Sequence, residues 1–206
     1  MHTPRLYGMS GSGNCWKPAV LMQHLDMPFE WVEVDIVNGA SRTPAFLSMN
    51  PNGKVPLLEV EGRYLAESNA MLCYLADGTP WLPQDRWARA RVMEWLFFEQ
   101  YSHEPHIATV RYWIRFLGKA EAWADRIAAA RDKGNAALAV MEQQLTRTDW
   151  LAGDTPTIAD LGLAAYTHVA DEGGYDLARY PAVSAWLQRL FALPRITPMS
   201  ALSVRR

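Results

Sequence analysis

The polar loop formed by residues 8–14 is the first stretch of the chain whose residue types could do chemistry. It follows a short apolar segment and precedes a predicted helix, so its N–H groups and hydroxyls lie where an anion binds at a helix N-terminus. Ser12 stands three residues before Cys15, where a redox Cys-x-x-Cys motif has its first cysteine. A serine there makes dithiol chemistry unavailable, but its hydroxyl can donate to a thiolate supplied by a ligand. An ordinary Gly/Ser loop is the alternative interpretation.

A second candidate segment is the turn of residues 50–53 with the Lys54-Val55-Pro56 sequence that follows it. An X-Pro bond in a polar loop just before a strand can adopt the cis form. A cis bond would turn the Val55 backbone outward to pair with a peptide ligand, and Lys54 could neutralise a carboxylate. A tight turn with a solvated lysine is the alternative.

The third candidate segment is Glu67-Ser68, where a predicted strand passes into a helix. We expect Ser68 to be the N-cap, with its hydroxyl and backbone N–H available to a carboxylate that the helix dipole also favours. Glu67 can pair with an ammonium group, so the two residues together fit the zwitterionic head of an amino acid. Simple capping by Ser68, with Glu67 at the surface, is the alternative.

The elements that must position these segments alternate between strand and helix over the first 78 residues. Apolar periodicity and turn signals predict strands at 5–7 and 31–36 and helices at 17–25, 43–49 and 68–77. They also predict a hairpin at 55–60 and 64–66 that turns at Glu61-Gly62. This βαβ-ββα order predicts an α/β domain in which helices flank a mixed sheet.

The pattern changes after residue 78, and beyond the Pro-bracketed segment 79–83 the apolar residues follow helical spacing. Helices are predicted at 87–117 (interrupted at Pro105), 120–145, 157–171 and 181–193. We therefore expect an α/β domain over 1–78, a linker over 79–86 and an all-helical domain over 87–206. Thr157 and Asp160 form a predicted capping box whose loss would cost about 0.5–2 kcal/mol of stability.

Composition excludes several classes of function. The 206 residues carry a formal net charge of −2 and half of them are apolar. Without a basic cluster, neither nucleic acid nor a membrane surface is an expected partner. The N-terminus lacks a signal-peptide core and two cysteines make no disulfide framework, so we expect a cytoplasmic protein. Nine tryptophans favour extensive aromatic packing and a pocket for flat apolar ligands.

The motifs together resemble the cytosolic glutathione transferase family over nearly the whole chain, in particular its bacterial, theta- and delta-like members with a catalytic serine. The resemblance rests on the Ser-x-x-Cys loop, on Val55-Pro56 with Glu67-Ser68 eleven residues after the proline, on the Pro-rich linker, and on Thr-x-x-Asp in the helical domain. It implies a thioredoxin-like first domain, glutathione as cosubstrate, a homodimer and a role in detoxification.

The resemblance also implies roles for single residues. Ser12 would donate a hydrogen bond to the glutathione sulfur, with Asn14 and Ser10 as alternative partners in the same loop. Five residues would hold the tripeptide: Val55 and Pro56 its cysteinyl backbone, Lys54 its glycyl carboxylate, and Glu67 and Ser68 its γ-glutamyl head. Cys15 is either a reactive thiol or a small packing residue.

The helical domain supplies candidates for the electrophile pocket: Ser102, Glu104, Arg111, Trp113 and Tyr166. Residues 99–106 hold two histidines and two carboxylates, but without a metal-ligand spacing, so no metal is expected. A polar helix kink at Pro105 and aromatic core packing are the alternatives.

The leading prediction is a transferase that directs the glutathione thiolate at a small, apolar or aromatic electrophile. Two other chemistries fit the same fold: peroxide or disulfide reduction, favoured if Asn14 governs the sulfur, and isomerisation. A non-enzymatic interaction module with a decayed pocket is the alternative from another class.

Overall fold

The computed structural model describes residues 3–202 of the protein. These residues form two compact units: a first unit of residues 3–77 with residues 193–202, and a helical unit of residues 78–192. The expected bounds at residues 1 and 206 lie outside the described part of the chain.

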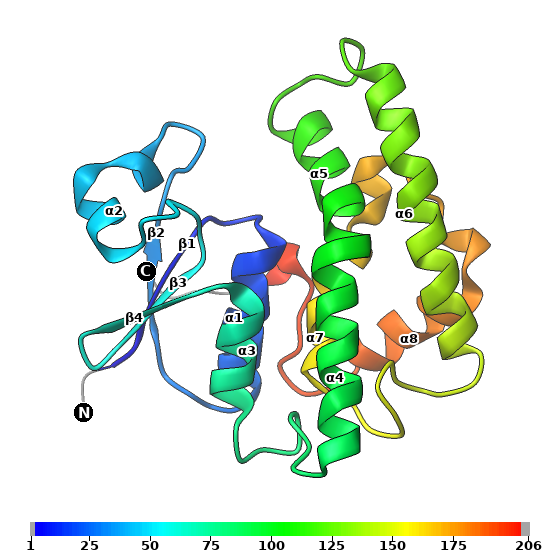
Figure 1. Ribbon diagram of the computed structural model, residues 1–206, viewed down its shortest axis with the longest axis horizontal. Coiled ribbons are helices and arrows are strands. Elements are labelled where there is room, and N and C mark those ends of the chain that lie inside the picture. Colours follow the sequence, from blue (N-terminus) through cyan, green and yellow to red (C-terminus); the bar gives the residue numbers. More distant parts are fainter. Residues whose placement is uncertain (1–2, 203–206) are drawn as a thin grey trace. The chain divides into compact units, whose positions relative to one another are not determined.

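A four-stranded sheet forms the centre of the first unit (Figure 1). Its strands are β1 (Arg5–Gly8), β2 (Glu30–Glu33), β3 (Leu57–Val60) and β4 (Arg63–Ala66), in the order β2-β1-β3-β4. β1 pairs parallel with β2, while β3 is antiparallel to both β1 and β4. A parallel pair needs a crossover connection, which α1 (Gly13–His24) provides between β1 and β2.

Helices cover both faces of this sheet. α2 (Pro44–Met49) follows the short 3₁₀ helix η1 (Ala40–Arg42) and packs Phe46 against Val34 and Leu57. α1 and α3 (Ser68–Ala76) lie side by side on the opposite face (Figure 1). The predicted βαβ-ββα order and the thioredoxin-like fold are confirmed.

The β3–β4 hairpin turns at the predicted dipeptide Glu61-Gly62. Both residues have positive φ angles, 51° and 73°. Two such residues give the turn a twist that matches the right-handed twist of the strands. The hairpin therefore follows from local sequence alone.

Residues 193–202 pack with the first unit, although we expected the helical domain to extend to residue 206. The Trp16 indole Nε1 donates to the Thr197 carbonyl oxygen at 2.8 Å, and His24 Nδ1 lies 2.8 Å from the Pro194 carbonyl oxygen. Arg195 pairs with Asp26. These contacts hold the segment, including η5 (Met199–Ala201), to α1. Local sequence patterns do not reveal contacts over about 170 residues.

The second unit is built from helices, as predicted. They are α4 (Arg86–Phe98), the π-helix η2 (Glu99–His103), α5 (Glu104–Arg115), α6 (Ala124–Leu145), α7 (Ile158–Thr167) and α8 (Pro181–Phe191), with 3₁₀ turns η3 (Ala170–Gly173) and η4 (Leu177–Arg179). No helix within residues 3–202 is long and apolar enough to cross a membrane.

The predicted kink at Pro105 takes the form of the π-helix η2. Proline lacks the N–H of a regular turn, and its ring clashes with the carbonyl group four residues earlier. Immediately before it, the Glu104 N–H donates to the carbonyl oxygen of Glu99, five residues back. The wider turn lets the chain pass from α4 into α5 without a break.

Candidate active site

Strand register brings the three predicted segments to one edge of the sheet. Leu57 pairs with Tyr7 on one side and with Ala66 on the other. In an antiparallel register, the next position places Pro56 between Gly8 on one side and Glu67 on the other. The loop after β1, the turn before β3 and the start of α3 consequently meet at this edge.

The loop after β1 presents two hydroxyls with different partners. The Ser10 backbone N–H and hydroxyl both donate to the Glu33 carboxylate, at 2.8 Å each. Ser12 is the N-cap residue of α1 and hydrogen-bonds to the Cys15 sulfur. The Ser10 proton is thus directed at a charged acceptor, whereas the Ser12 proton is directed at the sulfur of a neutral thiol, which is a much weaker acceptor.

Glu33, the last residue of β2, is a partner of this loop that sequence reasoning missed. Besides Ser10, its carboxylate accepts a bond from the Trp31 indole Nε1 at 2.7 Å. A methyl group on Gly8 would lie 2.6 Å from the Trp31 ring, so only glycine fits there. Glu33 therefore ties the loop to β2, but its place in an alternating strand gave no signal of this contact.

Cys15 is buried rather than reactive. Its side chain is 0 % exposed, and the Met9 N–H lies 3.4 Å from its sulfur. Burial raises the pKa of the Cys15 thiol to about 11, despite the hydrogen bonds from Ser12 and Met9. The thiolate is the reactive form of cysteine, so Cys15 acts as a packing residue here.

We expect iodoacetamide at about pH 7.5 to leave Cys15 unmodified in the folded protein. At a pKa of about 11 only roughly one thiol in three thousand is ionised at that pH. Cys73, which is partly exposed, should react first. Peptide mapping by mass spectrometry checks this, with the urea-unfolded protein as the control in which both react. Alkylation of native Cys15 as fast as in urea would contradict its burial.

The turn before β3 is organised by Asn50. The Asn50 Nδ2 donates to the Lys54 carbonyl oxygen at 2.8 Å, and its Oδ1 accepts from the Asn52 N–H at 3.2 Å. The Val55-Pro56 bond is cis, as the sequence suggested. The Lys54 side chain is exposed, and Val55 is partly buried against the α2 face of the sheet.

At the start of α3 the structure corrects one assignment. The N-cap is Glu67, and Ser68 is the first helical residue. Glu67 is exposed and has a φ angle of 68°, a region that residues other than glycine rarely adopt. Such strain costs about 1–3 kcal/mol and is concentrated at functional sites. Ser68 does not cap because its hydroxyl is turned toward α1.

The Ser68 side chain belongs to a buried polar cluster with residues of α1. Its hydroxyl donates to the Asn14 Oδ1 at 3.1 Å and accepts from the Lys17 Nζ at 3.3 Å. Lys17 also donates to the Asn69 Oδ1 at 3.3 Å. Asn14 and Ser68 are thus brought together as candidates, whereas Lys17 and Asn69 were missed. A single charged residue inside the apolar run 15–22 was the signal that could have found Lys17.

The five candidates of the helical unit lie on η2, α5 and α7. The Arg111 Nε donates to Glu172 at 3.0 Å in a largely buried ion pair. Trp113 packs edge-on against Trp123, with ring centroids 5.5 Å apart. Ser102 lies in η2, Glu104 at the start of α5, and Tyr166, largely buried, in α7.

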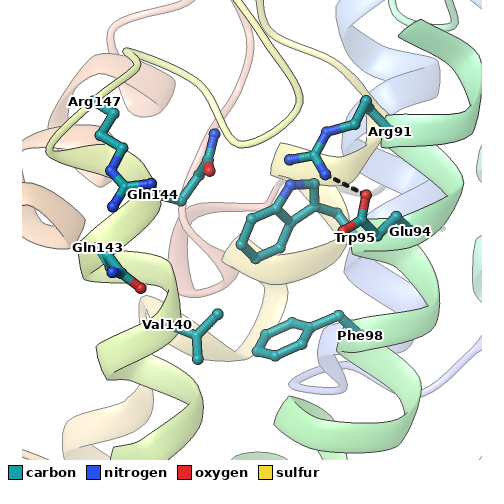
Figure 2. Close-up of a pocket in the computed structure, with 8 residues that line it drawn as sticks. All are labelled: Arg91, Glu94, Trp95, Phe98, Val140, Gln143, Gln144 and Arg147. Atoms are coloured by element: carbon teal, nitrogen blue, oxygen red, sulfur yellow. Dashed lines mark hydrogen bonds and ion pairs between the residues drawn. The ribbon is translucent and has the colours of Figure 1, made fainter. Parts of the chain in front are cut away.

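A cavity of about 290 Å³ lies between α4 and α6 of this unit. Figure 2 shows Trp95 and Phe98 of α4 facing Val140 of α6. Five polar residues complete the lining: Arg91, Glu94, Gln143, Gln144 and Arg147. None of the five predicted electrophile-pocket residues is among the lining residues of this cavity.

No group of three or more His, Cys, Asp or Glu side chains in the described chain is arranged to hold a metal ion.

Comparisons with known proteins bear on both units. Residues 3–77 match the family model described as glutathione S-transferase, N-terminal domain, and residues 101–194 match the corresponding C-terminal domain. Glutathione S-transferase 3 of Zea mays is 32% identical, over 92% of this chain and 90% of that protein. The chain belongs to the glutathione S-transferase family.

Two solved bacterial glutathione S-transferases are more similar still. The enzyme from Pseudomonas fluorescens is 49% identical with a TM-score of 0.94, covering 96% of this chain and 99% of that one. The enzyme from Xanthobacter autotrophicus is 51% identical with a TM-score of 0.92, covering 96% and 97%. The predictions of the family, of the two-part fold and of a glutathione transferase enzyme are confirmed.

Proposed function

We propose that the protein binds glutathione at the sheet edge formed by the three segments and that the Ser12 hydroxyl donates to its sulfur. The observation that carries the proposal is the 3.1 Å hydrogen bond from the Ser68 hydroxyl to the Asn14 Oδ1. It joins the segment that would hold the γ-glutamyl head to the first turn of α1, where Ser12 is the N-cap. This hydrogen bond would thus link the place of the γ-glutamyl head to the place of the cysteinyl sulfur.

The mechanism follows from the ionisation of the thiol. A free thiol with a pKa of about 8.5 is only a few per cent thiolate at neutral pH, and the thiolate is the nucleophile. A hydroxyl donor and the N-terminus of α1 both favour the anion. Ser12 acts as a donor and not as a base, since its hydroxyl is far less acidic than the thiol.

The remaining parts of glutathione have complementary partners at the same edge. The exposed Lys54 would pair with the glycyl carboxylate, and the backbone at Val55 and Pro56 would pair with the cysteinyl unit. Glu67 would bind the α-ammonium group, and the backbone N–H of Ser68 at the N-terminus of α3 would bind the neighbouring carboxylate. A glutathione transferase family member from Pseudomonas fluorescens, 25% identical with a TM-score of 0.83, carries two glutathione molecules in its structure.

We also propose the finer assignments that the family suggests. The electrophile is small and apolar or aromatic, and Ser102, Glu104, Arg111, Trp113 and Tyr166 belong to its pocket. A cytoplasmic detoxification enzyme that forms a homodimer fits the family. Three exposed aromatic side chains along α4 and η2 support the dimer: Trp87, Phe97 and Tyr101, which are 76%, 71% and 86% exposed.

Reduction of disulfides with glutathione is a second candidate function. It is favoured by the place of Asn14, which the polar cluster holds in the first turn of α1 beside Ser12. The disulfide-bond oxidoreductase YfcG of Escherichia coli is 26% identical, over 88% of this chain and 87% of that protein. If Asn14 rather than Ser12 donates to the sulfur, disulfide reduction becomes the favoured function.

Calorimetric titration with glutathione, paired with ultraviolet detection of the bound thiolate, tests the proposal. Saturable binding with a thiolate signal near neutral pH is expected. No binding at millimolar glutathione would overturn the proposed function and favour an interaction module.

In the same titration, Glu67→Ala should weaken glutathione binding about tenfold, because the ammonium group loses a charged partner. Glu61→Ala is a matched control, since Glu61 is also an exposed acid with positive φ but lies in the hairpin turn. Unchanged affinity in Glu67→Ala would remove Glu67 from the site.

A further inference from the structure

Lys17 is a fully buried lysine in the first unit. Its side chain is 0 % exposed, on a helix whose neighbouring residues 15–22 are otherwise apolar or proline. Lysine is almost never fully buried unless it is paired, because removing an ammonium group from water is costly. Lys17 is not among the candidate site residues found in the sequence, so the reason for its burial must lie in its contacts.

Two contacts of this ammonium group lead to the start of α3. The Lys17 Nζ lies 3.3 Å from the Ser68 Oγ and 3.3 Å from the Asn69 Oδ1. The Ser68 Oγ lies 3.1 Å from the Oδ1 of Asn14, which stands one helical turn before Lys17 on α1. Lys17 and Asn14 thus approach the same hydroxyl from one face of α1.

The chemistry of these groups fixes the direction of the two hydrogen bonds. An ammonium group only donates hydrogen bonds, so the Ser68 oxygen must accept from Lys17. The Ser68 hydrogen is then directed at Asn14, and the Asn14 atom that receives it must be the carbonyl oxygen Oδ1. The Asn14 amide nitrogen, which carries two donors, therefore lies on the side of the side chain away from Ser68.

We infer that Lys17 is a positioning residue of the glutathione site. Its ammonium group orders the hydrogen bonds that link Lys17, Ser68 and Asn14, so that the Asn14 amide donates toward the place of the sulfur. The inference rests on the proposed function, and it deepens that function by adding a second donor beside Ser12. Lys17 acts through Ser68 and Asn14 and need not touch the ligand.

The same arrangement favours anionic ligand groups. A buried ammonium polarises the hydroxyl that it donates to, and each bond of such a chain strengthens the next. Its charge adds to the positive ends of α1 and α3. Both the γ-glutamyl carboxylate and the thiolate are anions, so one buried cation supports the binding of both groups.

The test is Lys17→Met, which keeps an unbranched apolar chain of similar length but removes the charge and the donors. The thiolate absorbance of bound glutathione is titrated against pH. We expect the pKa of the bound thiol to rise by about one unit and kcat near pH 6.5 to fall about tenfold, with recovery at higher pH. Lys133→Met, which changes an exposed lysine of α6, is the matched control and should leave both values unchanged.

The outcomes separate the inference from the proposed function. If the wild-type protein neither binds nor ionises glutathione, the proposed function fails and the inference fails with it. If the wild type does both and Lys17→Met lowers only the melting temperature, Lys17 is structural and the inference alone is overturned.

If Lys17→Met does not fold, Asn14→Asp decides. Aspartate can still accept from Ser68 but offers no amide donors, so the pKa of the bound thiol should rise by about one unit or more. An unchanged thiol pKa in this variant would show that the Asn14 amide does not donate to the sulfur and would overturn the inference.

Discussion

Ser12→Ala is expected to lower kcat/KM for the reaction of glutathione with a model electrophile by about 10- to 100-fold at neutral pH. A hydrogen bond to a charged group is worth about 1.5–3 kcal/mol, so the pKa of the bound thiol should rise by about 1–2 units. Glutathione affinity should change by less than about threefold, because the lost bond strengthens as the sulfur ionises. Steady-state kinetics with a thiolate titration measures both effects.

The fold should tolerate this change. Although Ser12 is the N-cap of α1, its side chain makes no capping hydrogen bond within residues 3–202. Ser48→Ala is a matched control, since that exposed serine of α2 bonds its own helix backbone, at Ala45, 2.7 Å away. Full activity of Ser12→Ala would instead assign the sulfur to Asn14 or Ser10. Loss of activity in Asn14→Ala alone would favour the disulfide reductase.

Asp160→Ala should destabilise the protein by about 3–5 kcal/mol, well above the ~0.5–2 kcal/mol expected for a helix cap. The capping box is confirmed: the Asp160 carboxylate accepts from the Thr157 N–H at 2.8 Å, and the Thr157 hydroxyl caps α7. The same buried carboxylate also accepts from the Leu151 N–H at 3.0 Å and from the Trp186 Nε1 at 2.9 Å. Removing it leaves three buried N–H donors without their acceptor.

Calorimetric melting checks this prediction, with a fall in Tm of roughly 10 °C expected for a chain of this size. Asp154→Ala, an exposed aspartate in the loop before α7, is the control and should change stability by less than about 0.5 kcal/mol. A loss of only about 1 kcal/mol in Asp160→Ala would mean that the Trp186 and Leu151 donors find other partners.

The order of secondary structure was readable from local sequence because its signals are local. Alternation predicted the strands, Pro-bracketed segments marked the change to helices, and Glu61-Gly62 predicted the hairpin turn. Boundaries were less exact. α1 begins at Gly13, four residues before the predicted start, because its first two residues, Gly13 and Asn14, have low helix propensity and gave no helical signal.

The three candidate segments could also be found from sequence, since each has a distinctive composition at a junction between elements. Their meeting at one sheet edge depends on strand pairing, which the predicted order already constrains. The N-cap at Ser68 was misassigned because its hydroxyl bonds across to α1, and a pattern within one helix cannot reveal a partner 54 residues away.

The family, the two-part architecture and the three candidate segments could be read from the sequence, because periodicity, turns and motif spacing are properties of short segments. Three features became visible only in the folded chain: the Ser10 hydroxyl bonds Glu33, Cys15 is buried, and the Lys17 ammonium group reaches Ser68, 51 residues away. These depend on packing between elements distant in the chain. Burial then sets the ionisation of a thiol and the direction of a hydrogen-bond chain, which no local pattern encodes.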